Sequence, residues 1–220
     1  MELPLIRQVQ LLFLKEIKSE WKQRHALNGI MLQLVAAVFI AYLSLGSLKT
    51  QVWNGLFWII LMLTTIQAVA RGFLQESQGK MLYLHQMASP QAIILGKIIY
   101  NIFMAFILGI ACILTYILLL SNEIVHWDIF LATMFLFSAG LSALVGTLSA
   151  LASKAGSNHL LVPVLSFPLL IPLVLVAVRA SKVATGLMNM AGYKDIWVLL
   201  LFDVMLVFLS VLLYRFVWRE

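Results

Sequence analysis

This sequence has few charged residues, a single cysteine and no recognisable catalytic motif. Only 11% of its 220 residues are charged, whereas 63% are hydrophobic, and the mean hydropathy is +1.01. That balance excludes a soluble domain. The single cysteine, Cys112, excludes a disulfide framework. The sequence holds no phosphate-binding glycine loop, no His-Glu-x-x-His pair and no serine-elbow motif, so we do not expect an enzyme.

Long apolar runs are what the sequence has instead. At about 20 residues per crossing, they predict an all-α polytopic membrane protein with six transmembrane helices. The spans must be helical because backbone exposed to lipid has to satisfy its own hydrogen bonds. The predicted spans cover residues 29–48, 52–70, 92–120, 129–152, 160–178 and 196–217.

Residues 1–28 precede the first span and are amphipathic. Ile6, Val9, Phe13 and Ile17 recur at the three- and four-residue spacing of one helix face, with lysines largely off that stripe. Such a helix is predicted to lie in the membrane interface. The alternative is an ordinary helix packed against a partner.

The distribution of Lys and Arg predicts the orientation, because cations concentrate on the cytoplasmic side. Both termini are therefore expected to be cytoplasmic. The formal net charge of +6 indicates contact with anionic lipid headgroups rather than nucleic acid, because the cations flank apolar spans. Eleven cations lie on the predicted cytoplasmic side, namely Arg7, Lys15, Lys18, Lys22, Arg24, Arg71, Lys80, Lys97, Lys154, Arg215 and Arg219. Four lie on the other side, namely Lys49, Arg179, Lys182 and Lys194.

The polar segment 71–91, between the second and third spans, is longer than a turn requires. Its apolar residues predict a short cytoplasmic helix with one apolar face, which favours docking on a partner over exposure to water. The alternative is a surface turn without a partner. The residues expected to carry the contact are Glu76, Gly79, Leu82, Leu84 and Met87, with Pro90 ending the helix.

Prolines mark the fifth span. Pro163, Pro168 and Pro172 each remove a backbone donor, so we expect kinks that could serve gating. Residues 179–195 follow, and they are too polar to cross a membrane. They are predicted to form a broken, partly re-entrant hairpin loop on the outer side.

Two further features concern the membrane interior. Asp203 is an acid well inside a span, which makes it a candidate functional residue, with a hydrogen bond between helices as the alternative. Ser142 and Gly146 belong to a group of small residues that permits close helix packing. The four histidines have no second ligand at metal-binding spacing, so no metal site is predicted.

Two of these segments resemble a known family, the B subunit of the haem exporter of bacterial cytochrome c maturation, a permease of the ABC-2 type. One is Arg71-x-Phe73-x-x-Glu76-x-x-Gly79-x-x-Leu82 to Pro90, followed by Gly96-Lys97. The other is Leu161-Val-Pro163-Val-Leu-Ser-Phe-Pro168-Leu-Leu-Ile-Pro172. The size, the six spans and the N-terminal helix are similar over nearly the whole chain. The loop departs from many relatives in having few acids before the glycine.

The resemblance implies an ABC-2-like fold in the bacterial inner membrane. An ATP-binding subunit would dock on the 71–91 loop, near the helix from Leu5 to Trp21, and ATP hydrolysis would rock the helices. It also implies a separate haem-handling membrane subunit and a permease dimer of identical or different chains. ATP would be bound by the partner, haem would be cargo, and this chain would hold no tight cofactor.

Two other functions stay open from the residues. One is an ABC-2 permease that exports a lipid, a polysaccharide or a drug. The other is a membrane scaffold that transports nothing. Within the haem pathway, the chain could move haem across the membrane or drive the release of a haem-loaded chaperone.

Overall fold

The computed structural model describes residues 4–22, 24–46, 49–74, 88–154, 161–188 and 193–217. Within these ranges every regular element is an α-helix. The helices are α1 (Leu5–Lys22), α2 (Arg24–Leu45), α3 (Thr50–Leu74), α5 (Pro90–Leu119), α6 (Trp127–Lys154), α7 (Leu161–Ala184) and α8 (Tyr193–Val217).

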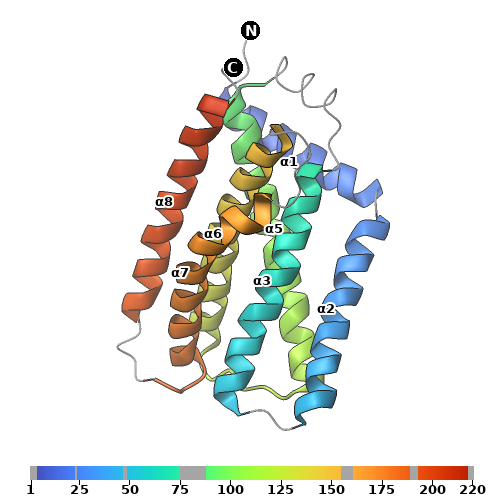
Figure 1. The fold of residues 1–220 in the computed structure, drawn as a ribbon, viewed down its shortest axis with the longest axis vertical. Coiled ribbons are helices and arrows are strands. Elements are labelled where there is room, and N and C mark those ends of the chain that lie inside the picture. Colours follow the sequence, from blue (N-terminus) through green and yellow to red (C-terminus); the bar gives the residue numbers. More distant parts are fainter. Residues whose placement is uncertain are drawn as a thin grey trace.

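Six of these helices run along a bundle, and α1 lies across one end of it (Figure 1). The end of α3, the start of α5 and the end of α8 lie at the same end of the bundle as α1. The end of α2, the start of α3 and the connection 120–126 lie at the opposite end. The chain therefore passes up and down the bundle from one helix to the next.

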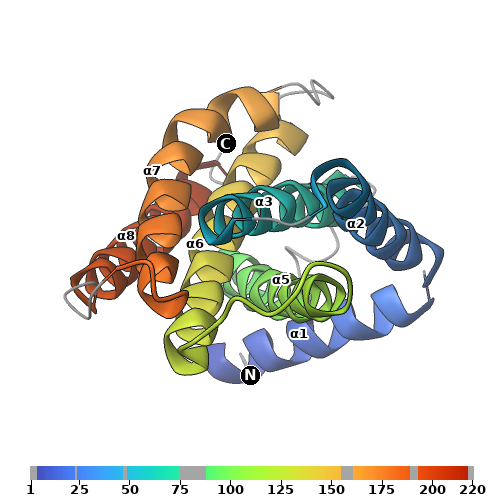
Figure 2. The ribbon, with the colours of Figure 1, turned by 90° about the horizontal axis from the view of Figure 1, so that it is seen from below.

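The centre of the bundle is α6, which packs against α3, α5, α7 and α8 (Figure 2). Its apolar stretch is 78% buried, whereas the corresponding stretches of α2 and α8 are 22% buried. The close packing expected from small residues is seen at Gly140, where an added Cβ would overlap Asp203 and come within 2.9 Å of Leu173. Small residues place α6 at the centre because they let neighbouring backbones approach.

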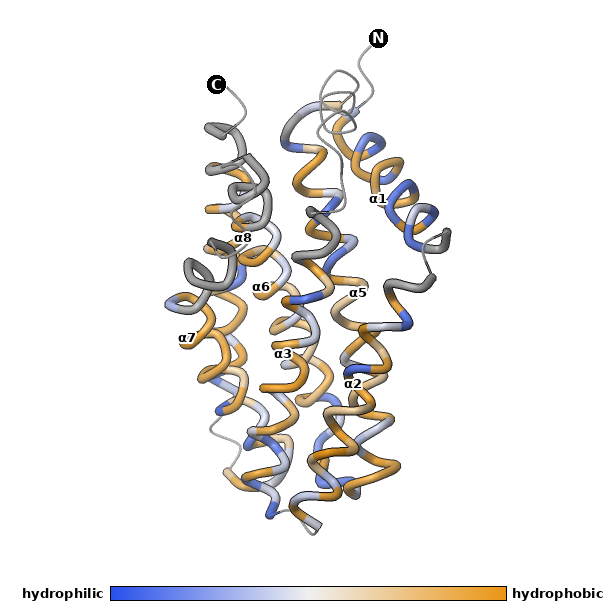
Figure 3. The backbone as a smooth tube through the Cα atoms, turned by 45° about the vertical axis from the view of Figure 1, so that its right-hand side comes forward, coloured by the Kyte–Doolittle hydropathy of each residue, from blue (hydrophilic) through white to orange (hydrophobic). Residues whose placement is uncertain are grey.

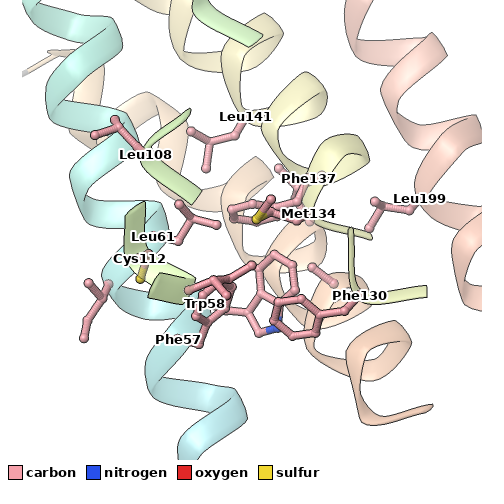
Figure 4. Close-up of a cluster of buried hydrophobic side chains, with 14 of the residues drawn as sticks. Phe57, Trp58, Leu61, Leu108, Cys112, Phe130, Met134, Phe137, Leu141 and Leu199 are labelled. Atoms are coloured by element: carbon pink, nitrogen blue, oxygen red, sulfur yellow. The ribbon is translucent and has the colours of Figure 1, made fainter. Parts of the chain in front are cut away.

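Aromatic rings fill the core between α3, α5 and α6. Trp53 and Phe57 stack at 5.9 Å between ring centroids, and Trp58 meets Phe137 edge-on at 5.0 Å. Phe130 lies against Phe57 and Trp58 (Figure 4). The thiol of Cys112 is buried in the same cluster, which is the packing role expected of a lone membrane cysteine.

Helix α1 alternates polar and apolar residues, whereas the other helices are apolar over most of their length (Figure 3). Its apolar stripe contacts α5, with Phe13 meeting Phe103 edge-on at 6.0 Å between ring centroids. Part of the amphipathic pattern therefore serves packing within the chain. Residues Ile6, Leu11 and Leu14 remain exposed on α1.

Five described helices are long and apolar enough to cross a membrane, which agrees with a polytopic helical membrane protein. Their apolar stretches are Leu27–Leu45, Thr50–Val69, Gln91–Leu119, Trp127–Leu148 and Tyr193–Leu212. The helices themselves extend beyond the predicted spans by two to five residues at several ends, as at Arg24 and Leu74. Polar residues in a terminal turn do not end a helix, which explains the difference.

The predicted outer loop 179–195 is wrong in its extent, because α7 continues to Ala184 and α8 begins at Tyr193. The helix end is a Schellman motif. Gly186, with φ +71°, donates to the carbonyl of Val183 at 3.1 Å, and Leu187 donates to the carbonyl of Lys182 at 2.9 Å. The polar residues 179–182 form the last turns of α7, where Arg179 pairs with Asp195 at 3.7 Å.

Helix α7 changes direction along its length. Its first turns run across the bundle, and the rest follows the bundle beside α6 and α8 (Figures 1 and 2). Pro168 and Pro172 lie inside the helix, and Pro163 lies in its first turn. The two internal prolines leave the carbonyls of residues 164 and 168 without their helical donors, which permits the bend. A role of the bend in gating stays a prediction.

Replacing Gly186 by alanine is expected to destabilise the chain by about 1 kcal/mol, because only glycine adopts its left-handed conformation without strain. The measurement is the apparent midpoint of thermal unfolding in detergent micelles. The matched control is Gly55→Ala within α3, where an added Cβ meets nothing within 4 Å and alanine favours the helix. An equal or higher midpoint for Gly186→Ala than for the control contradicts this account of the helix end.

Candidate functional site

The predicted docking loop is only partly described by the structure. Glu76, Gly79, Leu82, Leu84 and Met87 lie outside the described residues. Pro90 is the first residue of α5, and Ser89 caps that helix by accepting from the amide of Ala92 at 3.3 Å. Proline suits this position because its missing N–H would have no helical partner there. The residue expected to end a helix therefore begins the next one.

Helix α1 is bonded to the point where the loop re-enters the bundle. The side-chain carbonyl of Gln8 accepts from the amide of Ser89 at 3.1 Å and from its hydroxyl at 3.2 Å. The N-cap of α5 therefore contacts α1 and α5 at once.

Two more contacts hold α1 along α5. A Cβ added at Gly96 would lie 3.0 Å from the Cβ of Leu12, so the two helices touch closely there. Phe103 meets Phe13 one heptad further along. Ser89, Gly96 and Phe103 are spaced by seven residues and lie on one face of α5. We call these three contacts the α1–α5 clamp.

Lys97 and Asn101 follow Gly96 on α5 and are both buried, at 6% and 5% exposure. Lysines are almost never buried to this depth unless they are paired. It was expected to lie just inside the span. The structure makes it part of the helix that the clamp holds.

Asp203 lies in the membrane-spanning part of α8 and is 5% exposed. Neither carboxyl oxygen has a hydrogen-bond partner among the described residues. The carboxyl group packs on Gly140 of α6, with Leu173 of α7 at the same place. The alternative role predicted for Asp203 was a hydrogen bond between helices. Its side chain forms no such bond among the described residues. Because an unpaired buried polar group costs free energy, Asp203 remains a candidate functional residue.

Polar groups continue along the same seam between α6 and α8. The hydroxyl of Thr147 donates to the hydroxyl of Ser210 at 2.5 Å, and Ser210 in turn donates to the carbonyl of Leu206 at 2.7 Å. A cavity of about 70 Å³ adjoins this pair, lined by residues of α6, α7 and α8. Leu206 lines the cavity one helical turn from Asp203. The acid therefore lies close to a small void at the contact of three helices.

A second polar cluster joins α3 to α7 and was missed from the sequence. The indole of Trp58 donates to Ser181 at 2.7 Å and to Asn54 at 3.0 Å. Ser181 donates to the side-chain carbonyl of Asn54 at 2.7 Å, and the amide of Asn54 donates to the carbonyl of Val178 at 3.2 Å. An asparagine inside an apolar run was the available signal, since buried amides need partners.

Metal binding finds no support among the described residues, where no three His, Cys, Asp or Glu side chains gather. His126 donates its backbone amide to the carbonyl of Ala184 at 2.9 Å, which ties the α5–α6 connection to the end of α7. The side chains of His25, His85 and His159 lie outside the described residues.

One comparison with known proteins gives a match. A family model described as CcmB protein matches residues 7–217, nearly the whole chain. No curated protein and no solved structure matches this chain.

The contact between Gly140 and Asp203 gives a prediction that tests the packing of α6. Gly140→Ala is expected to lower the thermal midpoint and the folded yield, because the new methyl overlaps the Asp203 carboxyl group. The double variant Gly140→Ala with Asp203→Ala is expected to recover part of the loss. Recovery stays partial because Leu173 still lies 2.9 Å from the added Cβ.

The comparison is read as a double-mutant cycle of thermal midpoints in detergent. The coupling between the two sites is expected to be about 1 kcal/mol or more, as for residues in contact. Additive effects of the two substitutions contradict the contact.

Proposed function

This chain belongs to the CcmB family, and from that premise we propose that it couples ATP hydrolysis by a partner subunit to haem export or to release of a haem-loaded chaperone. The family membership itself makes the chain a membrane permease component of the ABC transporter that serves cytochrome c maturation. The system includes an ATP-binding partner. The permease component typically carries no catalytic activity itself.

The proposed permease has six spans and an ABC-2-like fold. Five are the helices long and apolar enough to cross, and α7 is the sixth. Supporting this, α7 runs beside α6 and α8 for most of its length (Figure 2). Six crossings return the chain to the side from which it started, and α1 and the end of α8 do lie at one end of the bundle.

That end is proposed to be cytoplasmic, in the bacterial inner membrane. The sequence predicts that eleven of the fifteen Lys and Arg residues lie on the cytoplasmic side, including Arg7, Lys15 and Lys18 of α1. The opposite end holds Lys49, Arg179, Lys182 and Lys194. The difference agrees with the concentration of cations on the cytoplasmic side of membrane proteins.

The ATP-binding subunit is proposed to dock on residues 76–87. The observation that carries this proposal is the α1–α5 clamp, which begins at Ser89, two residues after Met87. A docking loop can couple ATP hydrolysis to transport only if its displacement reaches the membrane helices. The clamp supplies a short path, because Ser89 is bonded to α1 and starts α5, and α5 packs against α6.

The path of haem is proposed to run along an interface with another subunit rather than through one chain. Aromatic rings fill the core between α3, α5 and α6, and α6 is surrounded by four helices. This supports a dimer of permease subunits, together with a haem-handling membrane subunit. Haem is then cargo rather than a cofactor held by this chain.

Docking is tested by placing charge on the loop. Leu82→Asp together with Leu84→Asp is expected to abolish copurification of the ATP-binding subunit and to stop c-type cytochrome formation, because charge would replace apolar contact area. The control is Val125→Asp, an exposed apolar residue in the connection between α5 and α6, which lies at the opposite end of the bundle. The proposed docking is wrong if the ATPase copurifies equally with both variants.

Coupling through the clamp gives a separate prediction. Gln8→Ala removes both bonds to Ser89 and is expected to leave ATPase copurification intact while lowering c-type cytochrome formation severalfold. The loss follows because loop movement would no longer be shared with α1. Gln10→Ala, an exposed glutamine on the same helix, is the matched control. Normal cytochrome formation in folded Gln8→Ala chains rules out the clamp as the coupling path.

A further inference from the structure

A large apolar groove lies between α1, α2 and α5, and it shares Phe103 with the α1–α5 clamp. Its volume is about 560 Å³, and its lining includes Ile17 of α1, Leu27 and Met31 of α2, and Phe103 and Ile107 of α5. Three polar residues also line it, namely Glu20, Asn28 and Tyr100, although nearly all of the lining surface is apolar. We call it the α1–α2–α5 groove.

The groove lies where the membrane interface meets the hydrocarbon. The apolar stretch of α2 begins at Leu27, and that of α5 covers Gln91–Leu119, so both walls belong to membrane-spanning helices. The third wall is the amphipathic helix across the end of the bundle (Figure 1). Ile107 lies about 10 Å along α5 from Tyr100, at a rise of about 1.5 Å per residue. The groove is therefore polar near the interface and apolar deeper in the membrane.

Charge and polarity decide what can occupy such a groove. Water is a poor occupant because it needs several polar partners, which the deep wall does not offer. Lipid chains are the solvent around the outer faces of α2 and α5, where Leu32, Val35 and Phe103 are exposed. At the polar end Glu20 lies within hydrogen-bonding reach of Tyr100. A carboxylate there attracts a cation and repels an anionic headgroup.

We propose that the α1–α2–α5 groove binds one phospholipid with an ammonium headgroup, its acyl chain between α2 and α5 and its ammonium on Glu20. The acyl chain moves from the lipid bilayer into an equally apolar groove, so it contributes little to the selectivity for one lipid over another. The ion pair at Glu20 decides which lipid is held. This site is independent of the docking loop and of the cargo.

The test uses the full chain in nanodiscs containing equal amounts of phosphatidylethanolamine and phosphatidylglycerol. Native mass spectrometry after transfer to mild detergent then measures the retained lipid. We expect one phosphatidylethanolamine per chain, enriched about two- to fivefold over phosphatidylglycerol, the range of a partly exposed ion pair. Glu20→Gln is expected to abolish the enrichment, whereas Glu16→Gln on the same helix is expected to keep it.

A second pair of variants tests the acyl-chain position. Ile107→Trp is expected to fill the groove and remove the retained lipid. Leu114→Trp, at an exposed position two turns further along α5, is expected to retain it. The Glu20 and Glu16 variants leave the apolar packing unchanged, so they decide the question even where a tryptophan variant fails to fold.

Three results would overturn the proposal. One is equal retention of the two lipids by the unaltered chain. Another is equal enrichment in the Glu20→Gln and Glu16→Gln variants. The third is loss of retained lipid with a second copy of the chain or another protein in its place, which would make the groove a protein interface.

Discussion

The approach of α6 to its neighbours is the constraint on which the rest of the bundle depends. Helices inside a membrane have no hydrophobic driving force toward one another, so close packing contributes much of what holds them together. Gly140 lets α7 and α8 reach α6 through Leu173 and Asp203, and the aromatic rings of α3 fill the opposite side. A larger side chain at Gly140 would separate three helices at once. The central position of α6 is therefore set by a residue without a side chain.

Two polar groups within the bundle illustrate opposite outcomes of burial. Asn54, Trp58 and Ser181 satisfy one another and fix the contact of α3 with α7. Asp203 has no such partner among the described residues, although it is equally buried. A satisfied cluster adds rigidity, whereas an unsatisfied acid stores a cost that another partner or another arrangement of helices can relieve. The first cluster is structural, whereas Asp203 remains a candidate functional residue.

The sequence was informative where lipid imposes the rule and less so where distant residues meet. Apolar runs predicted the helices because a span must be apolar over about 20 residues. The loop 179–195 was predicted too long because Arg179 and Ser181 look like loop residues until Asp195 and Trp58 are seen beside them. Gly186 was a local signal for the helix end. Nothing local could have predicted the bonds of Gln8 to Ser89, which join residues 81 positions apart.

The position of α1 gives the coupling proposal its direction. This helix packs far more extensively on α5 than on α2, although α2 follows it directly in the chain. Movement of the loop would therefore pass through Ser89 and Gly96 into α5, which itself contacts both α2 and α6. Because α6 contacts α3, α7 and α8 as well, a shift entering at α5 reaches nearly every other spanning helix through one central element.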